Sequence, residues 1–290
     1  MLLYEEVVEY QICALIEEAS KTTDKEIKEK QEEILKKLDN TLKKIAKENI
    51  EIEGYGKLTY ERLRKIILDK KEQKKFLKAL GFSEDYIEKN SNLIVRLLKK
   101  DLNVKDVINV FVTNTINEFK KSKLKFSLKV LLLIVLVLFC VVVNTACVKF
   151  LMGLVGSKVL GFLLGAIFVA PIVEELYKYI SVKLKVGLAG QIIFNIAEAS
   201  LYIVGMVSIG FNILLAISLR IIPIIMHVLN ALRFEKHNIY KKLGDKYADI
   251  RAFILNIVLH AYHNIMASFT GFGSLVSIYL NKLALGRKKG

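Results

Sequence analysis

The chain lacks two features that would each have pointed to a particular class of protein. Its three cysteines, Cys13, Cys140 and Cys147, are too few for a disulfide framework and do not have the spacing of a metal-binding motif. No long apolar run occurs before residue 127, so the sequence predicts no signal peptide at its start. We therefore expect the first half of the chain to remain in the cytoplasm.

Acidic residues are scarce in the second half of the chain. Residues 1–126 hold 27 of the 44 Lys and Arg and 23 of the 29 Asp and Glu, which leaves 17 basic and six acidic residues for 127–290. Long apolar stretches fill this second half. In a membrane protein, basic residues in short loops set the orientation of the spans. The net charge of +15 therefore does not predict a nucleic-acid partner, and the lipid bilayer is the expected one.

Residues 1–126 are predicted to form a soluble, highly charged helical domain. An apolar stripe runs from Met1 to Ser20, and a capping box at Thr23–Glu26 precedes a helix that reaches about Glu48. The sequence Glu53-Gly54-Tyr55-Gly56 interrupts the helical pattern. Further helices are expected over Thr59–Leu80 with Gly81 as C-cap, from Ser83 to about Lys100, and from Asn103 to Lys120–Lys125.

Residues 127–290 contain five long apolar stretches, and a membrane span needs about 20 apolar residues. The last stretch is either one tilted helix or a helix followed by a short segment that dips into the interface. The predicted fold class is therefore all-α, a polytopic membrane bundle of five to six spans after the soluble helical domain. The stretches are Ser127–Leu151, Val159–Ile180, Gly187–Val207, Ile209–Leu232 and Ala252–Leu280.

Charged residues between these stretches predict the orientation of the bundle. Basic clusters at Lys120–Lys125, Lys183–Lys185 and Arg233–Lys246 fall on one side of the membrane if the first half is cytoplasmic. The third cluster is expected to be a polar loop, with a solvated His237. It also contains or adjoins three of the six carboxylates of this half, namely Glu235, Asp245 and Asp249.

The other three carboxylates, Glu174, Glu175 and Glu198, lie inside apolar stretches. A charged side chain near the centre of a bilayer costs about 2.5–3.5 kcal/mol on insertion scales, so such residues usually belong to a functional site. Glu174 and Lys178 are spaced i, i+4, which favours an ion pair along one helix.

Polar residues in three later stretches also fall on single helical faces. We therefore expect several helices to enclose one shared polar cavity. Pro223 is expected to kink the stretch in which it lies. The polar sets are Gln191, Asn195, Glu198 and Tyr202; Arg220 and His227; and Asn256, His260 and Asn264, with His263 beside the last set.

Four motifs in this order resemble those of the PrsW family of membrane proteases, over about residues 155–270. Pro171–Lys178 is similar to the Glu-Glu-x-x-Lys motif of the family, and Phe194–Glu198 with Tyr202 to its Phe-x-x-x-Glu motif. Arg220–His227 resembles its histidine-bearing helix, and His260–Asn264 its closing His-x-x-x-Asn. The family is grouped with CAAX-processing and Abi-type membrane proteases and with the Aph-type scaffold subunit of gamma-secretase.

Two departures favour the PrsW branch over the prenyl-protease branch. CAAX-type enzymes have an Arg five residues after the first Glu, whereas this chain has Lys178 four residues after Glu174. They also have a His where this chain has Glu198. The resemblance does not cover the soluble half.

The resemblance implies an intramembrane glutamic protease that uses water as the nucleophile, needs no metal or other cofactor, and cleaves a membrane-associated protein or peptide. Glu174 is the implied base and Glu198 its partner, while His260 and Asn264, which lie one turn apart, are expected to donate hydrogen bonds to the oxyanion. The remaining implied site residues are His227 in the acid–base set, Glu175 and Lys178 as orienting groups, and Tyr202 and Arg220 in support.

Two other functions remain open from the sequence. Two Glu and two His would suffice as ligands of a catalytic metal ion, although no His-Glu-x-x-His motif is present. A non-catalytic scaffold or transporter would also have a polar cavity within the membrane, since intramembrane acids mark ion pathways.

Overall fold

The computed structural model describes residues 40–286 except 41, 44, 45, 91, 99, 209 and 270. The predicted stripe and capping box before residue 27 lie outside these residues, as does most of the helix predicted to end near Glu48. The described part of the chain is almost entirely helical and divides into two compact units. One contains the residues up to Asn109 together with Ile239–Asp245, and the other contains Val110–Asn238 and residues 246–286.

The first unit begins with a small antiparallel hairpin of β1 (Glu51–Ile52) and β2 (Gly56–Lys57). The helix predicted over Thr59–Leu80 is two helices, because the side chain of Asp69 accepts a hydrogen bond from the backbone N–H of Lys71 and starts a new helix there. The helix predicted after Ser83 is also divided. The helices are α3 (Tyr60–Leu68), α4 (Lys70–Leu80), α5 (Glu84–Lys89), α6 (Leu93–Leu98) and the beginning of α7 (Val104–Lys121).

Two of the predicted helix ends in this unit are confirmed. Gly81 ends α4 with a φ of 106°, a left-handed conformation that favours glycine. Asn103 starts α7, where its side chain and that of Asp106 each accept a hydrogen bond from the other's backbone N–H. Asp106 also holds Arg96 through two hydrogen bonds. Burial and the neighbouring Asp106 carboxylate raise the pKa of Tyr86 to about 12.

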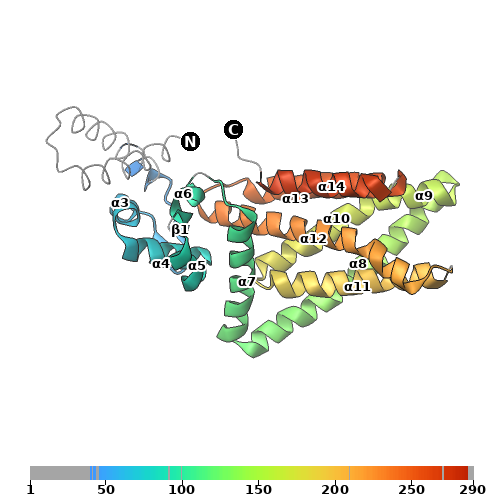
Figure 1. Ribbon diagram of the computed structural model, residues 1–290, viewed down its shortest axis with the longest axis horizontal. Coiled ribbons are helices and arrows are strands. Elements are labelled where there is room, and N and C mark those ends of the chain that lie inside the picture. Colours follow the sequence, from blue (N-terminus) through green and yellow to red (C-terminus); the bar gives the residue numbers. More distant parts are fainter. Residues whose placement is uncertain are drawn as a thin grey trace. The chain divides into compact units, whose positions relative to one another are not determined.

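The second unit is a bundle of long helices (Figure 1). Four segments of the described chain are long and apolar enough to cross a membrane, namely α8, α9 through α10, α11 and α12. This agrees with a membrane protein and with the first four predicted spans. The elements are α8 (Lys123–Val155), α9 (Lys158–Leu164), the π-helical turn η1 (Gly165–Val169), α10 (Ala170–Lys183), α11 (Gly187–Ser208), α12 (Ile213–Lys242), α13 (Ala248–Phe269) and α14 (Gly271–Gly286).

Within residues 233–280 the structure excludes one of two alternatives and corrects one prediction. The stretch Ala252–Leu280 is not one tilted helix, because α13 and α14 are separate helices that pack side by side (Figure 1). The polar loop predicted over Arg233–Lys246 is mostly helix, since α12 continues to Lys242. His237 is consequently part-buried, and its Nδ1 lies 2.9 Å from the backbone oxygen of Arg233.

The polarity of the bundle is reversed relative to that of a soluble protein. Large apolar side chains face outward, for example Leu138, Phe139, Val204 and Leu214, which are 62%, 61%, 69% and 71% exposed. Charged and amide side chains are buried between the helices. A hydrocarbon solvent favours this arrangement, because it solvates apolar surface and cannot solvate charge.

Close packing between α8 and α9 shapes the region beside the polar interior. Gly161 and Gly165 are spaced as in a Gly-x-x-x-Gly motif, which allows two helices to approach closely in a membrane. A Cβ atom at Gly161 would lie 2.5 Å from the backbone of Met152, and one at Gly165 would lie 2.4 Å from Val148. The π-helical turn η1 begins at Gly165, and Pro171 follows in the first turn of α10. Such turns often occur next to functional sites.

Candidate active site

A cavity of about 610 Å³ lies within the second unit. Its wall includes residues of α8, α9, η1, α10, α11, α12 and α13, so part of each polar stripe expected on separate helices meets in one place, whereas Gln191, Asn195 and Asn256 of those stripes do not line it. Seven of the nine site residues expected from the sequence motifs line this cavity: Glu174, Glu198, Tyr202, Arg220, His227, His260 and Asn264. The other two, Glu175 and Lys178, are fully buried behind it.

Glu175 is the centre of the hydrogen-bond network. Its Oε1 atom accepts hydrogen bonds from Lys178 Nζ at 2.5 Å, from Asn230 Nδ2 at 2.8 Å and from His260 Nδ1 at 2.8 Å. The predicted pair between Glu174 and Lys178 is therefore wrong. Lys178 pairs with Glu175 at i, i+3, which leaves Glu174 facing the cavity.

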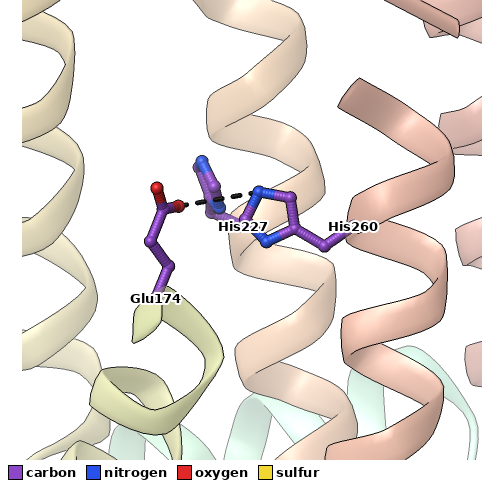
Figure 2. A group of neighbouring side chains, drawn as sticks. All are labelled: Glu174, His227 and His260. Carbon is purple, nitrogen blue, oxygen red and sulfur yellow. Dashed lines mark ion pairs between the residues drawn. The ribbon is translucent and has the colours of Figure 1, made fainter. Parts of the chain in front are cut away.

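The contacts of His260 determine which of its ring nitrogens carries the proton. Nδ1 faces the Glu175 carboxylate, so Nδ1 donates, and Nε2 of the neutral ring has a lone pair. This Nε2 lies 3.6 Å from Oε2 of Glu174. Figure 2 shows the Glu174 carboxylate and the rings of His227 and His260 converging from three helices. A gap of 3.6 Å is too long for a direct hydrogen bond but suits a water molecule bound to both atoms.

His227 is engaged at both ring nitrogens. Lys178 Nζ lies 2.8 Å from Nδ1 and donates to it, so the proton of the ring is on Nε2, which lies 2.9 Å from Glu198 Oε2. The other oxygen of Glu198 accepts a hydrogen bond of 2.7 Å from Arg220. The guanidinium group of Arg220 stacks 4.2 Å from the centre of the Tyr202 ring. Glu198 therefore has an imidazole and a guanidinium group as partners.

The buried charges of this region balance. Three carboxylates are matched by three cations when both imidazoles are neutral: Glu174, Glu175 and Glu198 by Lys178, Arg220 and Arg233. Among the described residues Glu174 is the one carboxylate of the three with no Lys or Arg in ion-pair contact. Its Oε2 is buried and accepts no hydrogen bond there. Because it lines the cavity and has no cation in contact, Glu174 is the carboxylate of the three best placed to accept a proton.

The residues expected to donate to an oxyanion have other acceptors. His260 Nδ1 donates to Glu175, and the Asn264 amide donates to the backbone oxygen of Ala166 in η1 at 2.7 Å. Asn264 thus also holds the π-helical turn beside the cavity. Arg220 Nε is buried and has no hydrogen-bond partner among the described residues, and Arg220 lines the cavity.

Sequence reasoning missed a second buried cluster next to the site. Arg233 is fully buried and donates to Asn230, to Asn256 and, at 2.6 Å, to Asn281 of α14. The sequence assigned Arg233 to a loop because it follows an apolar stretch directly. Extension of the polar stripe of Arg220 and His227 further along the same helix would have identified this cluster, since Asn230 lies three residues after His227. This cluster connects α12, α13 and α14 behind Glu175.

The cavity also holds three potential ligands of a metal ion. One ligand atom each from Glu174, His227 and His260 lie within 4.8 Å of one another (Figure 2). Glu174 and His260 Nε2 suit this role, and the contact of His260 Nδ1 with Glu175 is the second-shell contact common at metal-bound histidines. His227 suits it less well, because its nitrogens face Lys178 and Glu198.

Comparison with known proteins identifies no relative: no protein-family model, curated protein or solved structure matches this chain.

The network around Glu175 predicts a strong coupling between two buried charges. Replacement of one partner leaves an uncompensated charge, so Lys178→Met and Glu175→Gln should each lower the free energy of unfolding by about 3–5 kcal/mol. The double variant should lose much less than the sum of the two. Denaturant unfolding in detergent micelles, followed by circular dichroism, measures all three. Additive losses would show that the two charges do not interact.

Proposed function

We propose that this chain is a membrane-embedded peptidase in which Glu174 activates a water molecule. The substrate would be a membrane-associated protein or peptide, and no metal ion takes part. The substrate class follows from the resemblance of the four motifs to the PrsW family. The water-activating chemistry follows from the arrangement of the cavity.

One observation carries the proposal: a carboxylate and an imidazole nitrogen with a lone pair face each other across 3.6 Å at the wall of a cavity. Both can accept a hydrogen bond from the same water molecule. His260 is held in this orientation by Glu175, in the same way that a buried carboxylate orients the histidine of a catalytic triad. General-base catalysis needs such a base within hydrogen-bond reach of the nucleophile.

In the proposed reaction Glu174 accepts a proton from the water while the water oxygen attacks the carbonyl carbon of the substrate. Negative charge then develops on the carbonyl oxygen, and the Nε–H group of Arg220 is the donor available to it. The proton on Glu174 passes to the amide nitrogen as the C–N bond breaks. The products are a carboxylic acid and an amine, and the base is regenerated.

The other residues hold this arrangement in place. Glu198 and Tyr202 position Arg220, and His227 links Glu198 to Lys178. Asn264 holds η1 through Ala166. Glu198 is therefore proposed as a positioning residue, not as a second base, because Arg220 donates a hydrogen bond to one of its oxygens and His227 lies 2.9 Å from the other.

We further propose that the bundle has five to six spans, with its basic loops and the soluble helical domain in the cytoplasm. Cavity residues on α8 are near its C-terminal end, at Asn144–Met152, whereas its basic residues gather at its start. On α12 they fall at Arg220–His227, before the basic end of that helix. By the positive-inside rule the cavity therefore belongs to the half of the bundle that faces outward.

Glu174→Gln should lower the cleavage rate by about 10²- to 10⁴-fold, because glutamine cannot accept the proton. The assay uses a library of synthetic peptides, each with a membrane-anchoring helix and a randomised segment, with mass spectrometry of the products. Glu118→Gln is the matched control, since Glu118 pairs with Lys129 and does not line the cavity. Equal rates in wild type and Glu174→Gln would refute the proposed base.

The orientation is tested with single cysteines in a variant without the three native ones. Lys121→Cys and Lys158→Cys place exposed thiols just before α8 and at the start of α9, at opposite ends of one span. In intact cells a membrane-impermeant maleimide should label the second and should label the first only after lysis. The reverse pattern would place the cavity in the cytoplasmic half.

A second candidate is a metal-dependent hydrolase, favoured by the three potential ligand atoms within 4.8 Å. The ammonium group of Lys178, 2.8 Å from His227 Nδ1, opposes a further cation nearby. We therefore expect full cleavage of the same library after dialysis against a chelator. Loss of activity that zinc restores would favour the metal-dependent reaction instead.

A further inference from the structure

One wall of the cavity has no part in the proposed reaction. It is formed by a single face of α8, on which the positions i, i+1, i+4, i+5 and i+8 point to the same side. Two of its residues, Asn144 and Lys149, have polar groups without a hydrogen-bond or ion-pair partner among the described residues, although the helix before them is almost wholly apolar from Leu131 onward. The cavity-lining residues of this face are Asn144, Thr145, Val148, Lys149 and Met152.

Asn144 has an unsatisfied acceptor close to the reacting groups. Its Oδ1 is buried and accepts no hydrogen bond from the described residues. Asn144 also lines a smaller cavity of about 150 Å³, together with Glu174 and Glu198. An unpaired buried acceptor is unfavourable, and a bound group with an N–H donor would supply the missing hydrogen bond. The backbone of a peptide offers both a donor and an acceptor to such an amide.

Lys149 supplies the one charge on this face. The segment from Lys129 to Lys149 is about 30 Å long at 1.5 Å per residue, which is the thickness of the hydrocarbon core. Lys149 therefore reaches the level of the membrane surface while it lines the cavity. It forms no ion pair within the described part of the chain, and the cavity carboxylate Glu198 already binds Arg220.

We propose that this face of α8 selects the substrate, with Asn144 bound to the peptide backbone and Lys149 bound to an acidic side chain. The inference rests on the proposed function and adds a substrate class to it. Five helical residues separate the two groups by about 7.5 Å along the axis. An extended peptide advances about 3.3 Å per residue. The acidic residue therefore lies two or three positions from the residue whose backbone Asn144 binds.

The experiment compares wild type with Lys149→Glu, using the randomised peptide library in nanodiscs of phosphatidylcholine. Wild type should prefer Asp or Glu at one position by about three- to tenfold in kcat/KM, and Lys149→Glu should prefer Lys or Arg at the same position. Lys158→Glu is the matched control, because Lys158 is exposed at the same end of the bundle and does not line the cavity. Asn144→Leu should raise KM for all peptides alike and leave kcat nearly unchanged.

Other outcomes separate this inference from the proposed function. Cleavage without a charge preference, or a preference that Lys149→Glu does not alter, overturns the inference and leaves the peptidase standing. A preference that appears only when phosphatidylglycerol is added assigns Lys149 to lipid and also overturns it. If wild type cleaves no peptide, the proposed function fails. Binding of matched Asp- and Lys-containing peptides to the Glu174→Gln variant then decides the inference. A preference for the Asp-containing peptide that is reversed when Lys149→Glu is added to this variant supports it.

Discussion

A single oxygen atom, Oε1 of Glu175, organises the interior of the bundle. It accepts hydrogen bonds from Lys178 of its own helix, from Asn230 of α12 and from His260 of α13. A fully buried carboxylate is costly in a membrane unless donors surround it, and here the donors come from three helices. The same contacts fix the rotation of α10, and therefore direct Glu174 into the cavity. They also fix the ring of His260, whose Nε2 then faces Glu174.

The distribution of partners separates the three buried carboxylates by role. Glu175 is saturated with donors at one oxygen, and Glu198 is held by Arg220 and His227. Glu174 alone among the three has no Lys or Arg in contact within the described residues. The other two carboxylates are each paired with a cation, so the free energy cost of burial falls mainly on this one group. A carboxylate kept in this state beside a cavity is suited to accept a proton.

The sequence allowed the site to be located, but not its contacts to be assigned. Polar residues at helical spacing within apolar stretches predicted the shared cavity, because such residues cannot face lipid. Spacing also predicted an ion pair between Glu174 and Lys178, and this is wrong because i, i+3 and i, i+4 partners are equally close on a helix. The choice of Glu175 depends on Asn230 and His260, which come from other helices. Arg233 was missed because its helix continues past the apolar stretch, and Asn144 because a lone amide in a long span gives little signal.

The central claim is that Glu174 and His260 activate water as one unit. A double-mutant cycle of kcat/KM for Glu174→Gln, His260→Ala and the combined variant tests it directly, with one peptide that wild type cleaves. Residues that act together lose most of the rate when either is removed, so the combined variant should be about as slow as each single variant. Rate losses that multiply in the combined variant would show that the two residues act independently, and would contradict the account.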